Sequence, residues 1–258
     1  MASLARLYVF TLSHYCEKAR WACDRKGMPY RLVTLLPGAH LVTMRRFARN
    51  SQVPLLVHGR QVIQDSSAII DYLDSLYPAE PLTPADPAAA ASARAWEAEL
   101  DRELGETVRR IFYHHALQHP RYLAAEYSLG GPFWSSWFYA LALRPVVRAV
   151  GKLYEVTPEN VARDLARLES LFARLDRHFA AHRYLAGETF SRADLTLAAL
   201  AAGLLRPPEH PASRFPNRTV LPSWVEQIQR FRDSATAERV RELYRDERRV
   251  SQASPAPA

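Results

Sequence analysis

Residues 53–69 read VPLLVHGRQVIQDSSAI, and this stretch decides how the first third of the chain folds. Val53–Val57 and Gln61–Gln64 are short runs rich in apolar and β-branched residues, and the turn between them contains Gly59, as in a hairpin. Over Ser66–Tyr77 the apolar residues recur at helical spacing. The stretch therefore predicts two antiparallel strands followed by a helix.

The residues upstream of this hairpin alternate between strand and helix patterns. Leu7–Phe10 and Tyr30–Leu35 predict strands. Tyr15–Lys26 predicts a helix that ends before Gly27, because glycine commonly terminates helices, and His40–Arg49 predicts a short irregular helix. The order βαβ, helix, ββα predicts a mixed sheet with helices packed on it, which is a complete α/β domain.

Proline separates this first domain, residues 1–78, from the rest of the chain. Proline fixes the backbone and removes a donor, and four prolines fall within Pro78–Pro87, so residues 79–87 are predicted to form a linker. No convincing strand follows, and residues 88–250 predict an all-helical domain. The tail, residues 251–258, is predicted to be disordered.

Helical periodicity dominates the second domain. Ala88–His119 predicts a long helical run, and Pro158–His182 predicts a helix that Thr157 caps. A last helical segment is predicted to be capped by Ser223 and to cover residues 224–244.

One helix start in this domain has a complete capping signature. Ser191 can cap the helix and Asp194 stands where a capping-box acid returns the hydrogen bond, while Phe190 can pack on Leu195. The apolar run Leu195–Leu205 then predicts a helix that is buried on most sides.

Charge and apolar runs exclude two classes of partner. The net charge is +7, but the basic residues are interleaved with acidic ones, as over Arg239–Arg249, and no nucleic-acid-binding module is recognisable. The start of the chain has no apolar secretory segment, and the most apolar run, Pro132–Leu143, is shorter than the ~20 residues that cross a bilayer. We expect no nucleic-acid partner and no transmembrane segment, although the protein could touch a membrane surface.

The cysteines and histidines indicate neither a disulfide nor a metal site. Seven residues along one helix place Cys16 and Cys23 about 10 Å apart, too far to bridge, which favours a reducing, cytoplasmic location. The histidines lack ligand spacing with other candidate residues, so no metal is expected.

Three pieces of the first domain are expected to meet at one edge of its sheet. They are Ser13–Cys16 after the first strand, Val53-Pro54 before the third, and Asp65–Ile69 after the fourth. We interpret this edge as a binding site for a small thiol peptide.

These motifs are similar to those of a known family. Ser13 after the first strand, Gly38–Leu41, Val53-Pro54, Asp65–Ile69 and the capping segment Phe190–Leu195 occur in the order and spacing of that family. The chain resembles a cytosolic glutathione transferase of the theta-like serine type. The resemblance covers most of the chain and implies a thioredoxin-like N-terminal domain followed by an all-helical C-terminal domain.

The resemblance also implies a function. Glutathione would serve as co-substrate and be added to a small apolar electrophile held between the domains, in a detoxification role. The protein would be a cytoplasmic homodimer, and the sequence does not identify the electrophile.

Ser13 is the catalytic residue that the resemblance implies, because its hydroxyl would donate to the glutathione sulfur. A thiol pKa near 8.5 must fall to about 7 for half ionisation at neutral pH, a change of about 2 kcal/mol. One hydrogen bond to a charged sulfur contributes ~1.5–3 kcal/mol, and a helix N-terminus adds ~0.3–1 kcal/mol. The alternative role of Ser13 is a simple N-cap of the first helix.

The remaining glutathione contacts implied by the resemblance involve both backbone and side chains. In the family the Val53-Pro54 bond is cis, so the backbone of Val53 would pair with the cysteinyl unit as an added strand would. Ser66 at the helix N-terminus would hold the γ-glutamyl carboxylate and Asp65 its ammonium group, although both could be a plain helix cap.

His40 and Gln52 would meet the glycyl carboxylate of glutathione. The sequence departs from the family here, because Arg49–Gln52 lacks the usual glycine and lysine before Val53-Pro54. The glycyl contact could therefore differ from that of the family.

Two other functions remain open at this point. Cys16 could act in a glutathione-dependent thiol–disulfide oxidoreductase, because a helix N-terminus can lower a thiol pKa, although a buried helix cysteine is the preferred interpretation. The chain could also be a non-catalytic, glutathione-transferase-like binding or scaffold protein that docks on a membrane or partner through residues 133–139.

The aromatic segment 132–143 lies in a region, His119–Val156, that is long for the family and has no counterpart there. Its aromatic residues could line the electrophile pocket, cover a subunit interface, or form the core of a helical hairpin.

Overall fold

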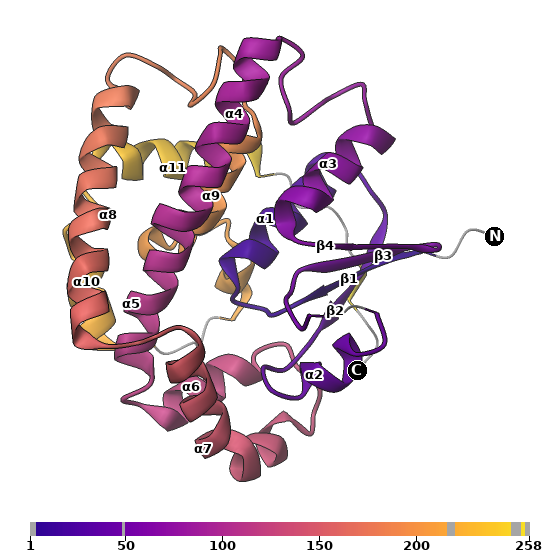
Figure 1. Ribbon diagram of the computed structural model, residues 1–258, viewed down its shortest axis with the longest axis vertical. Coiled ribbons are helices and arrows are strands. Elements are labelled where there is room, and N and C mark those ends of the chain that lie inside the picture. Colours follow the sequence, from indigo (N-terminus) through magenta and orange to yellow (C-terminus); the bar gives the residue numbers. More distant parts are fainter. Residues whose placement is uncertain (1–3, 48–49, 216–219, 249–253, 256–258) are drawn as a thin grey trace.

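The computed structural model describes residues 4–47, 50–215, 220–248 and 254–255. Within these ranges a mixed sheet with its flanking helices lies beside a larger group of helices (Figure 1). The chain therefore has a thioredoxin-like N-terminal domain and an all-helical C-terminal domain, which confirms the predicted fold class.

The sheet follows the predicted order of strands along the chain. Its strands are β1 (Ala5–Val9), β2 (Tyr30–Thr34), β3 (Leu55–His58), β4 (Gln61–Gln64) and β5 (Ser254–Pro255). β1 pairs in parallel with β2 and antiparallel with β3, and β3 pairs antiparallel with β4. The order across the sheet is β4-β3-β1-β2-β5.

Different helices cover the two faces of the sheet. These helices are α1 (His14–Arg25), α2 (His40–Met44) and α3 (Ser66–Leu76). Leu7 and Leu56 belong to the large core shared with α1 and α3, whereas their neighbours Tyr8 and Leu55 pack in a smaller cluster with Met44 of α2. Because successive strand residues point to opposite faces, α1 and α3 cover one face and α2 covers the other (Figure 1).

The second domain is helical throughout the described part of residues 87–247, apart from its connecting loops. Its α-helices are α4 (Pro87–Leu100), α5 (Thr107–Ala116), α6 (Pro120–Ser128), α7 (Ser135–Leu153), α8 (Pro158–Phe179), α9 (Arg192–Leu205), α10 (Pro222–Gln229) and α11 (Ala235–Glu247). Two shorter helical segments join them, η1 (Asp101–Glu106, a π-helix) and η2 (Pro211–Arg214, a 3₁₀-helix). Among the described residues no helix is both long and apolar enough to cross a membrane.

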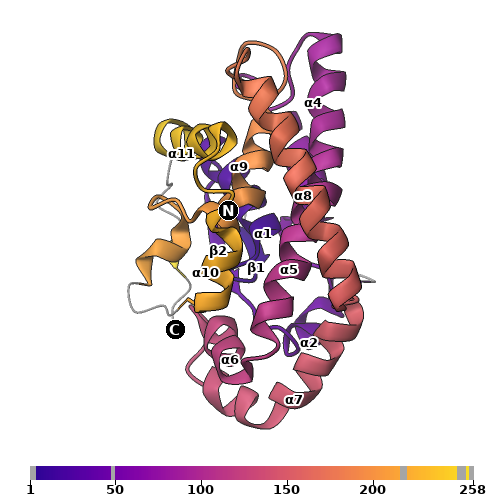
Figure 2. The ribbon, with the colours of Figure 1, turned by 90° about the vertical axis from the view of Figure 1, so that its left-hand side faces the viewer.

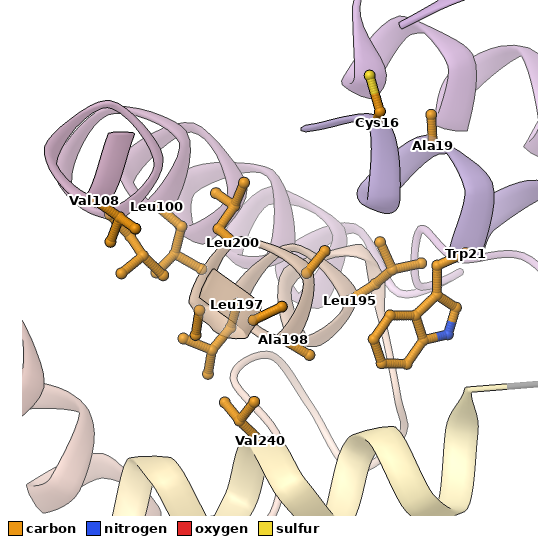
Figure 3. Packing of buried hydrophobic residues seen from close by; sticks show 14 of the residues in the cluster. Cys16, Ala19, Trp21, Leu100, Val108, Leu195, Leu197, Ala198, Leu200 and Val240 are labelled. Carbon is orange, nitrogen blue, oxygen red and sulfur yellow. The ribbon is translucent and has the colours of Figure 1, made fainter. Parts of the chain in front are cut away.

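Helix α9 is the centre of the hydrophobic core. Every one of its residues except Gly203 is buried, as its apolar sequence predicts. Trp21 of α1, Leu100 of α4 and Val240 of α11 surround Leu197 and its neighbours on α9 (Figure 3). In the turned view α9 lies between α11 and the α4–α5 side of the molecule (Figure 2). This single helix therefore ties the first domain to the second.

Several predicted helix ends are confirmed by their capping contacts. Thr157 Oγ1 accepts a hydrogen bond from the backbone N–H of Asn160 at 3.2 Å at the start of α8. Gly27, which follows α1, has a φ of +61°, a conformation that glycine adopts without strain.

The long run predicted over Ala88–His119 is broken by the π-helical segment η1. The hydroxyl of Tyr15 donates to the carbonyl of Asp101 at 2.6 Å, where α4 ends. A side chain at Gly105 would collide with the same tyrosine. The helix therefore bulges around the Tyr15 ring, a contact that periodicity within Ala88–His119 does not reveal.

The prediction of one last helix over residues 224–244 is wrong in two respects. It is two helices, α10 and α11, and Ser234 caps the second by accepting from Ala237 N–H at 3.0 Å. Pro222 rather than Ser223 begins α10, because the fixed φ of proline suits the first helical position.

The chain end differs from the predicted disordered tail where it is described. Ser254–Pro255 pair in parallel with Arg31 and Leu32 of β2. An edge strand offers unpaired N–H and C=O groups to any extended segment. The other residues of 251–258 lie outside the described ranges.

The predicted capping box at the start of α9 is confirmed. Asp194 accepts hydrogen bonds from the backbone N–H of Ser191 at 3.0 Å and of Leu185 at 2.8 Å, and Ser191 Oγ accepts from Ala193 N–H at 3.3 Å. All of these groups lie in the interior, where an unpaired donor is costly.

We expect Asp194→Ala to lower the free energy of unfolding by about 3 kcal/mol, because two buried N–H groups lose their acceptor at ~1–3 kcal/mol each. Ser191→Ala should cost about 1 kcal/mol, as is usual for a lost N-cap. Urea unfolding measures both values, and equal losses in the two variants would contradict the role given to Asp194.

Candidate glutathione site

The strand register brings the predicted site residues to one edge of the sheet. Leu55 of β3 pairs with Tyr8 of β1 on one side and with Gln64 of β4 on the other. Ser13 follows β1 and Val53 precedes β3 by two residues, so both lie near the edge at which Asp65 leaves β4. The loop after β2 reaches the same edge, because Val9 pairs with Thr34 at the ends of their strands.

Ser13 is the N-cap of α1. Its Oγ accepts from the backbone N–H of Cys16 at 3.4 Å, and its side chain is half-buried. A serine hydroxyl can accept and donate at once, so this cap leaves the hydroxyl proton for a further acceptor. The arrangement is compatible with both roles considered for Ser13.

The Val53-Pro54 peptide bond is cis. Within the described residues, the backbone N–H and C=O of Val53 make no hydrogen bond. Pro54 is buried, and its carbonyl accepts from Asp65 N–H at 3.4 Å. Val53 therefore presents one free donor and one free acceptor at the edge of the sheet, as a strand does where it can pair with an extended ligand.

Gln52 lies beside this edge and is exposed. Its carbonyl accepts from Gln64 Nε2 at 2.6 Å and its N–H donates to Asn50 Oδ1 at 3.0 Å. The side-chain amide of Gln52 has no hydrogen bond to the described part of the chain, so it is available to a ligand.

Asp65 caps α3 in an unusual backbone conformation, with φ +89°. Its Oδ1 accepts from the N–H groups of Ser67 at 2.8 Å and Ala68 at 3.1 Å. These are two of the N-terminal donors that the sequence interpretation left for a ligand carboxylate. The N–H of Ser66 remains without a partner in the described chain, but Ser66 is only 2% exposed.

His40 makes contacts within the chain. Its Nδ1 accepts from the backbone N–H of Gly38 at 3.0 Å, and its ring packs edge-on against Phe10 with centroids 4.9 Å apart. Burial is the largest influence and lowers the pKa of His40, with hydrogen bonds to the backbone of Leu36 and Ser51 opposing it. The imidazole is therefore neutral at pH 7, and the exposed Gln52 is the better candidate for a glycyl carboxylate.

Both cysteines are free and buried. Burial is the main cause that raises the pKa of Cys16 to about 11, although hydrogen bonding to Ser13 and to the Phe10 backbone lowers it in part. Burial likewise raises the pKa of Cys23 well above its ordinary value. Neither cysteine has the low pKa and access of a reactive thiol.

A buried charge cluster behind α3 is the part of the site that sequence reasoning missed. Lys18 Nζ is fully buried and lies 2.9 Å from Ser67 Oγ, 2.9 Å from Glu97 Oε1 and 3.0 Å from Asp101 Oδ2. The Ser67 Oγ lies 3.3 Å from the same carboxylate oxygen of Asp101. This cluster fixes the first turn of α3 against η1.

His14 is a second missed feature beside Ser13. Burial is the largest cause that lowers the pKa of His14 to about 3, and the charge of Arg109 lowers it further. Its Nε2 is buried with no hydrogen-bond partner in the described chain. His14 is therefore a neutral imidazole. Among the described residues no group of three or more His, Cys, Asp or Glu side chains could hold a metal ion.

The segment that follows α5 covers this edge from the second domain. Thr11 Oγ1 donates to the carbonyl of Leu129 at 2.5 Å, and the Tyr139 hydroxyl donates to the carbonyl of Pro37 at 3.0 Å. The aromatic side chains of segment 132–143 therefore differ in burial according to the side of the segment on which they lie. Tyr139 is buried, whereas Phe133 and Trp137 are 93% and 79% exposed and line no interior pocket.

Curated proteins are similar to part of this chain. Glutathione S-transferase 1 of Dianthus caryophyllus is 42% identical over 84 residues, which are 31% of this chain and 38% of that protein. Glutathione S-transferase Z2 of Arabidopsis thaliana is 39% identical over 84 residues, with the same coverage of 31% and 38%. The matched part thus spans well under half the length of these relatives.

Solved structures share the fold at low sequence identity. The beta-etherase LigF from Sphingobium sp. strain SYK-6 superposes with a TM-score of 0.63 at 21% identity, over 93% of this chain and 99% of that one. A glutathione S-transferase of Methylobacterium radiotolerans, in complex with glutathione sulfonate, has a TM-score of 0.55 at 20% identity and covers 99% and 100%.

Two family models match the chain and agree with this architecture. The N-terminal domain of glutathione S-transferase matches residues 7–81, and the C-terminal domain of glutathione S-transferase matches residues 138–228. Together they match more than half of the chain, and they fall on the sheet domain and the helical domain respectively. The chain belongs to the glutathione S-transferase family.

Proposed function

We propose that this protein is a glutathione transferase that adds glutathione to a small apolar electrophile. The observation that carries the proposal is the meeting of Ser13, the unpaired backbone of Val53 and the capped start of α3 at one sheet edge. Glutathione offers a matching set of groups, an extended peptide backbone with a thiol in the middle and a charged amino acid at its γ-glutamyl end. Family membership supports the same conclusion.

In this proposal Val53 pairs with the cysteinyl backbone of glutathione, and the turn after Pro54 holds the peptide in place. Asp65 uses Oδ1 as a helix cap, so its second oxygen remains to accept from the γ-glutamyl ammonium. The free N–H of Ser66 at the positive end of α3 binds the neighbouring carboxylate. Gln52 contacts the glycyl carboxylate, with His40 nearby as a neutral ring.

Ser13 is the proposed catalytic residue of a theta-like serine mechanism. Its Oγ already accepts from Cys16 N–H, so the hydroxyl proton donates to the sulfur of glutathione and stabilises the thiolate. The thiol gives its proton to water and the thiolate attacks the electrophilic carbon. A carbon–sulfur bond forms as the bond to the leaving group breaks, and the leaving group departs with that electron pair. No catalytic base is needed beyond water, because the thiol pKa must fall by only about 1.5, a change of about 2 kcal/mol.

We also propose a cytoplasmic homodimer with a detoxification role. The two free, buried thiols favour a reducing compartment, and family membership supports the dimer. The position of Phe138 supports an apolar electrophile. This ring packs near Gly38, on the side of the segment that faces the sheet edge.

Ser13→Ala is expected to raise the pKa of the bound glutathione thiol by about 1 to 2 and to slow conjugation at pH 7 by about 10- to 100-fold, the value of one hydrogen bond to a charged sulfur. Thiolate absorbance in the ultraviolet reports the pKa, and a chromogenic electrophile reports the rate. The slowing should fade at high pH, where the thiol ionises unaided.

Ser234→Ala is the matched control for that change, because Ser234 caps α11 far from the edge in the same way. Each variant should lose about 1 kcal/mol of stability. If Ser13→Ala kept both the thiol pKa and the rate of the wild type, Ser13 would be a helix cap only.

Asp65→Ala is expected to weaken glutathione binding by about tenfold or more, because a charge-assisted hydrogen bond to the γ-glutamyl ammonium contributes ~1.5–3 kcal/mol. Calorimetry measures the affinity. Asp86→Ala is the control, since Asp86 caps α4 by accepting from Ala89 N–H at 2.8 Å. Wild-type protein that folds but binds no glutathione would instead favour a scaffold role.

The burial of Cys16 disfavours the thiol–disulfide oxidoreductase alternative. We expect neither Cys16 nor Cys23 to react with a thiol reagent in the native protein at pH 8, and both to react after denaturation. Rapid native labelling that Cys16→Ser abolishes, together with a trapped mixed disulfide with glutathione, would reverse the choice between these functions.

A further inference from the structure

The outer side of the α6–α7 segment carries large apolar side chains in water. Phe133, Trp137 and Leu141 are 93%, 79% and 87% exposed, and they follow each other at intervals of four residues. Residues four apart lie on the same side of a helix, so Trp137 and Leu141 form one ridge on α7 and Phe133 precedes it. Contiguous exposed apolar surface of this kind marks an interaction site.

The same ridge continues as a row of cations. Arg144, Arg148 and Lys152 follow Leu141 at steps of three and four, and all three are exposed. Residues 127–154 contain no Asp or Glu. We call these six residues the α7 stripe: Phe133, Trp137, Leu141, Arg144, Arg148 and Lys152.

Contacts on the opposite side of α7 hold this helix so that the α7 stripe faces outward. Tyr139 is 2% exposed and its hydroxyl binds the Pro37 carbonyl, while Phe138 and Val146 pack near Gly38. The stripe is therefore not a surface left over from loose packing. Its direction is fixed by the first domain.

Helix α7, which carries most of the stripe, lies at one end of the molecule together with α2 (Figures 1 and 2). On that helix Leu41 and Val42 are 43% and 65% exposed, and Arg45 and Arg46 are exposed as well. Two neighbouring helices at this end thus combine exposed apolar and basic side chains.

A partner for this end must take aromatic and aliphatic side chains and, beside them, several cations. An anionic lipid surface meets both demands, because aromatic rings settle at the headgroup level while arginine and lysine contact lipid phosphates. In α7 the apolar half precedes the basic half along one ridge, so a single surface that meets this ridge contacts both kinds of side chain. In the described part of the chain, no helix is long and apolar enough to cross a bilayer.

We propose that the α7 stripe docks this protein peripherally on an anionic membrane surface. Trp137 and Leu141 insert at the headgroup boundary, and Arg144, Arg148 and Lys152 pair with lipid phosphates. The proposal does not depend on glutathione chemistry and stands if the protein is catalytically inactive.

The test uses the full-length protein and vesicles of phosphatidylcholine with or without phosphatidylserine, with cosedimentation as the readout. Binding is expected with phosphatidylserine and should weaken when NaCl rises from about 0.1 M to about 1 M, because the screening length falls about threefold. Arg144→Glu with Arg148→Glu should lower the partition coefficient by about thirtyfold or more, since each basic residue near the surface adds about fivefold.

Arg163→Glu with Arg167→Glu is the charge-matched control, because these exposed residues lie on α8 and not on α7. This control should keep binding within about threefold of wild type. Trp137→Ser with Leu141→Ser should also lower the partition coefficient, whereas Val62→Ser, at an exposed apolar residue on β4, should not.

Three results would overturn the proposal. One is absence of wild-type binding to phosphatidylserine vesicles at low salt. Another is an equal loss in the α7 and α8 charge variants, which would indicate a general charge effect. The third is a dimer that Trp137→Ser with Leu141→Ser dissociates in sedimentation while vesicles bind neither form, which would assign the stripe to a second copy of the chain.

Discussion

The buried guanidinium of Arg192 is the interaction on which the relative placement of the two domains depends. It stands at the start of α9, is 1% exposed, and lies 2.5 Å from Glu97 of α4 and 2.5 Å from Asp71 of α3. A charge taken out of water is costly unless it is paired and hydrogen-bonded, so these contacts hold only in one arrangement of α3, α4 and α9. Its Nη2 also donates to the carbonyl of Ser67 at 3.3 Å, which brings the same constraint to the first turn of α3. The proposed ligand end of α3 is therefore positioned by the helical domain.

Lys18 extends this constraint to α1. Its ammonium contacts Glu97, which also binds Arg192, and it contacts Asp101 and the Ser67 hydroxyl. Helices α1, α3, α4 and η1 are therefore joined by one continuous set of polar contacts around buried cations. Such a set adds little net stability compared with apolar packing, but it penalises every alternative arrangement that leaves one charge unpaired. The helix start that Ser13 caps and the helix start that Asp65 caps are consequently fixed relative to each other. Charge pairing behind the sheet edge, rather than the edge itself, gives the site its shape.

Patterns among residues close together in the sequence predicted much of this structure. They did not predict ion pairs between residues far apart in the sequence. The strand Gln61–Gln64 and the capping box of Ser191 and Asp194 were predicted because their determinants lie within a few residues of each other. The cluster at Lys18 was not predicted, since its partner Asp101 lies 83 residues away and a buried lysine looks the same in sequence as an exposed one. The contacts that His40 makes within the chain were not predicted for a similar reason. Its burial depends on packing against Phe10, which no local pattern reports.

Helix α7 contributes to two surfaces of the molecule, because the helical period places neighbouring residues on different sides. Tyr139 and Phe138 face the loop after β2, while Trp137 and Leu141 face away from it, a separation that follows from 3.6 residues per turn. The bond from Tyr139 to Pro37 and the bond from Thr11 to Leu129 place this segment directly against the sheet edge where Ser13 lies. If both proposals hold, a docked molecule would keep that edge close to the lipid surface. An apolar electrophile concentrates in a bilayer, so docking through the outward side of α7 would raise the concentration of this co-substrate near the glutathione site.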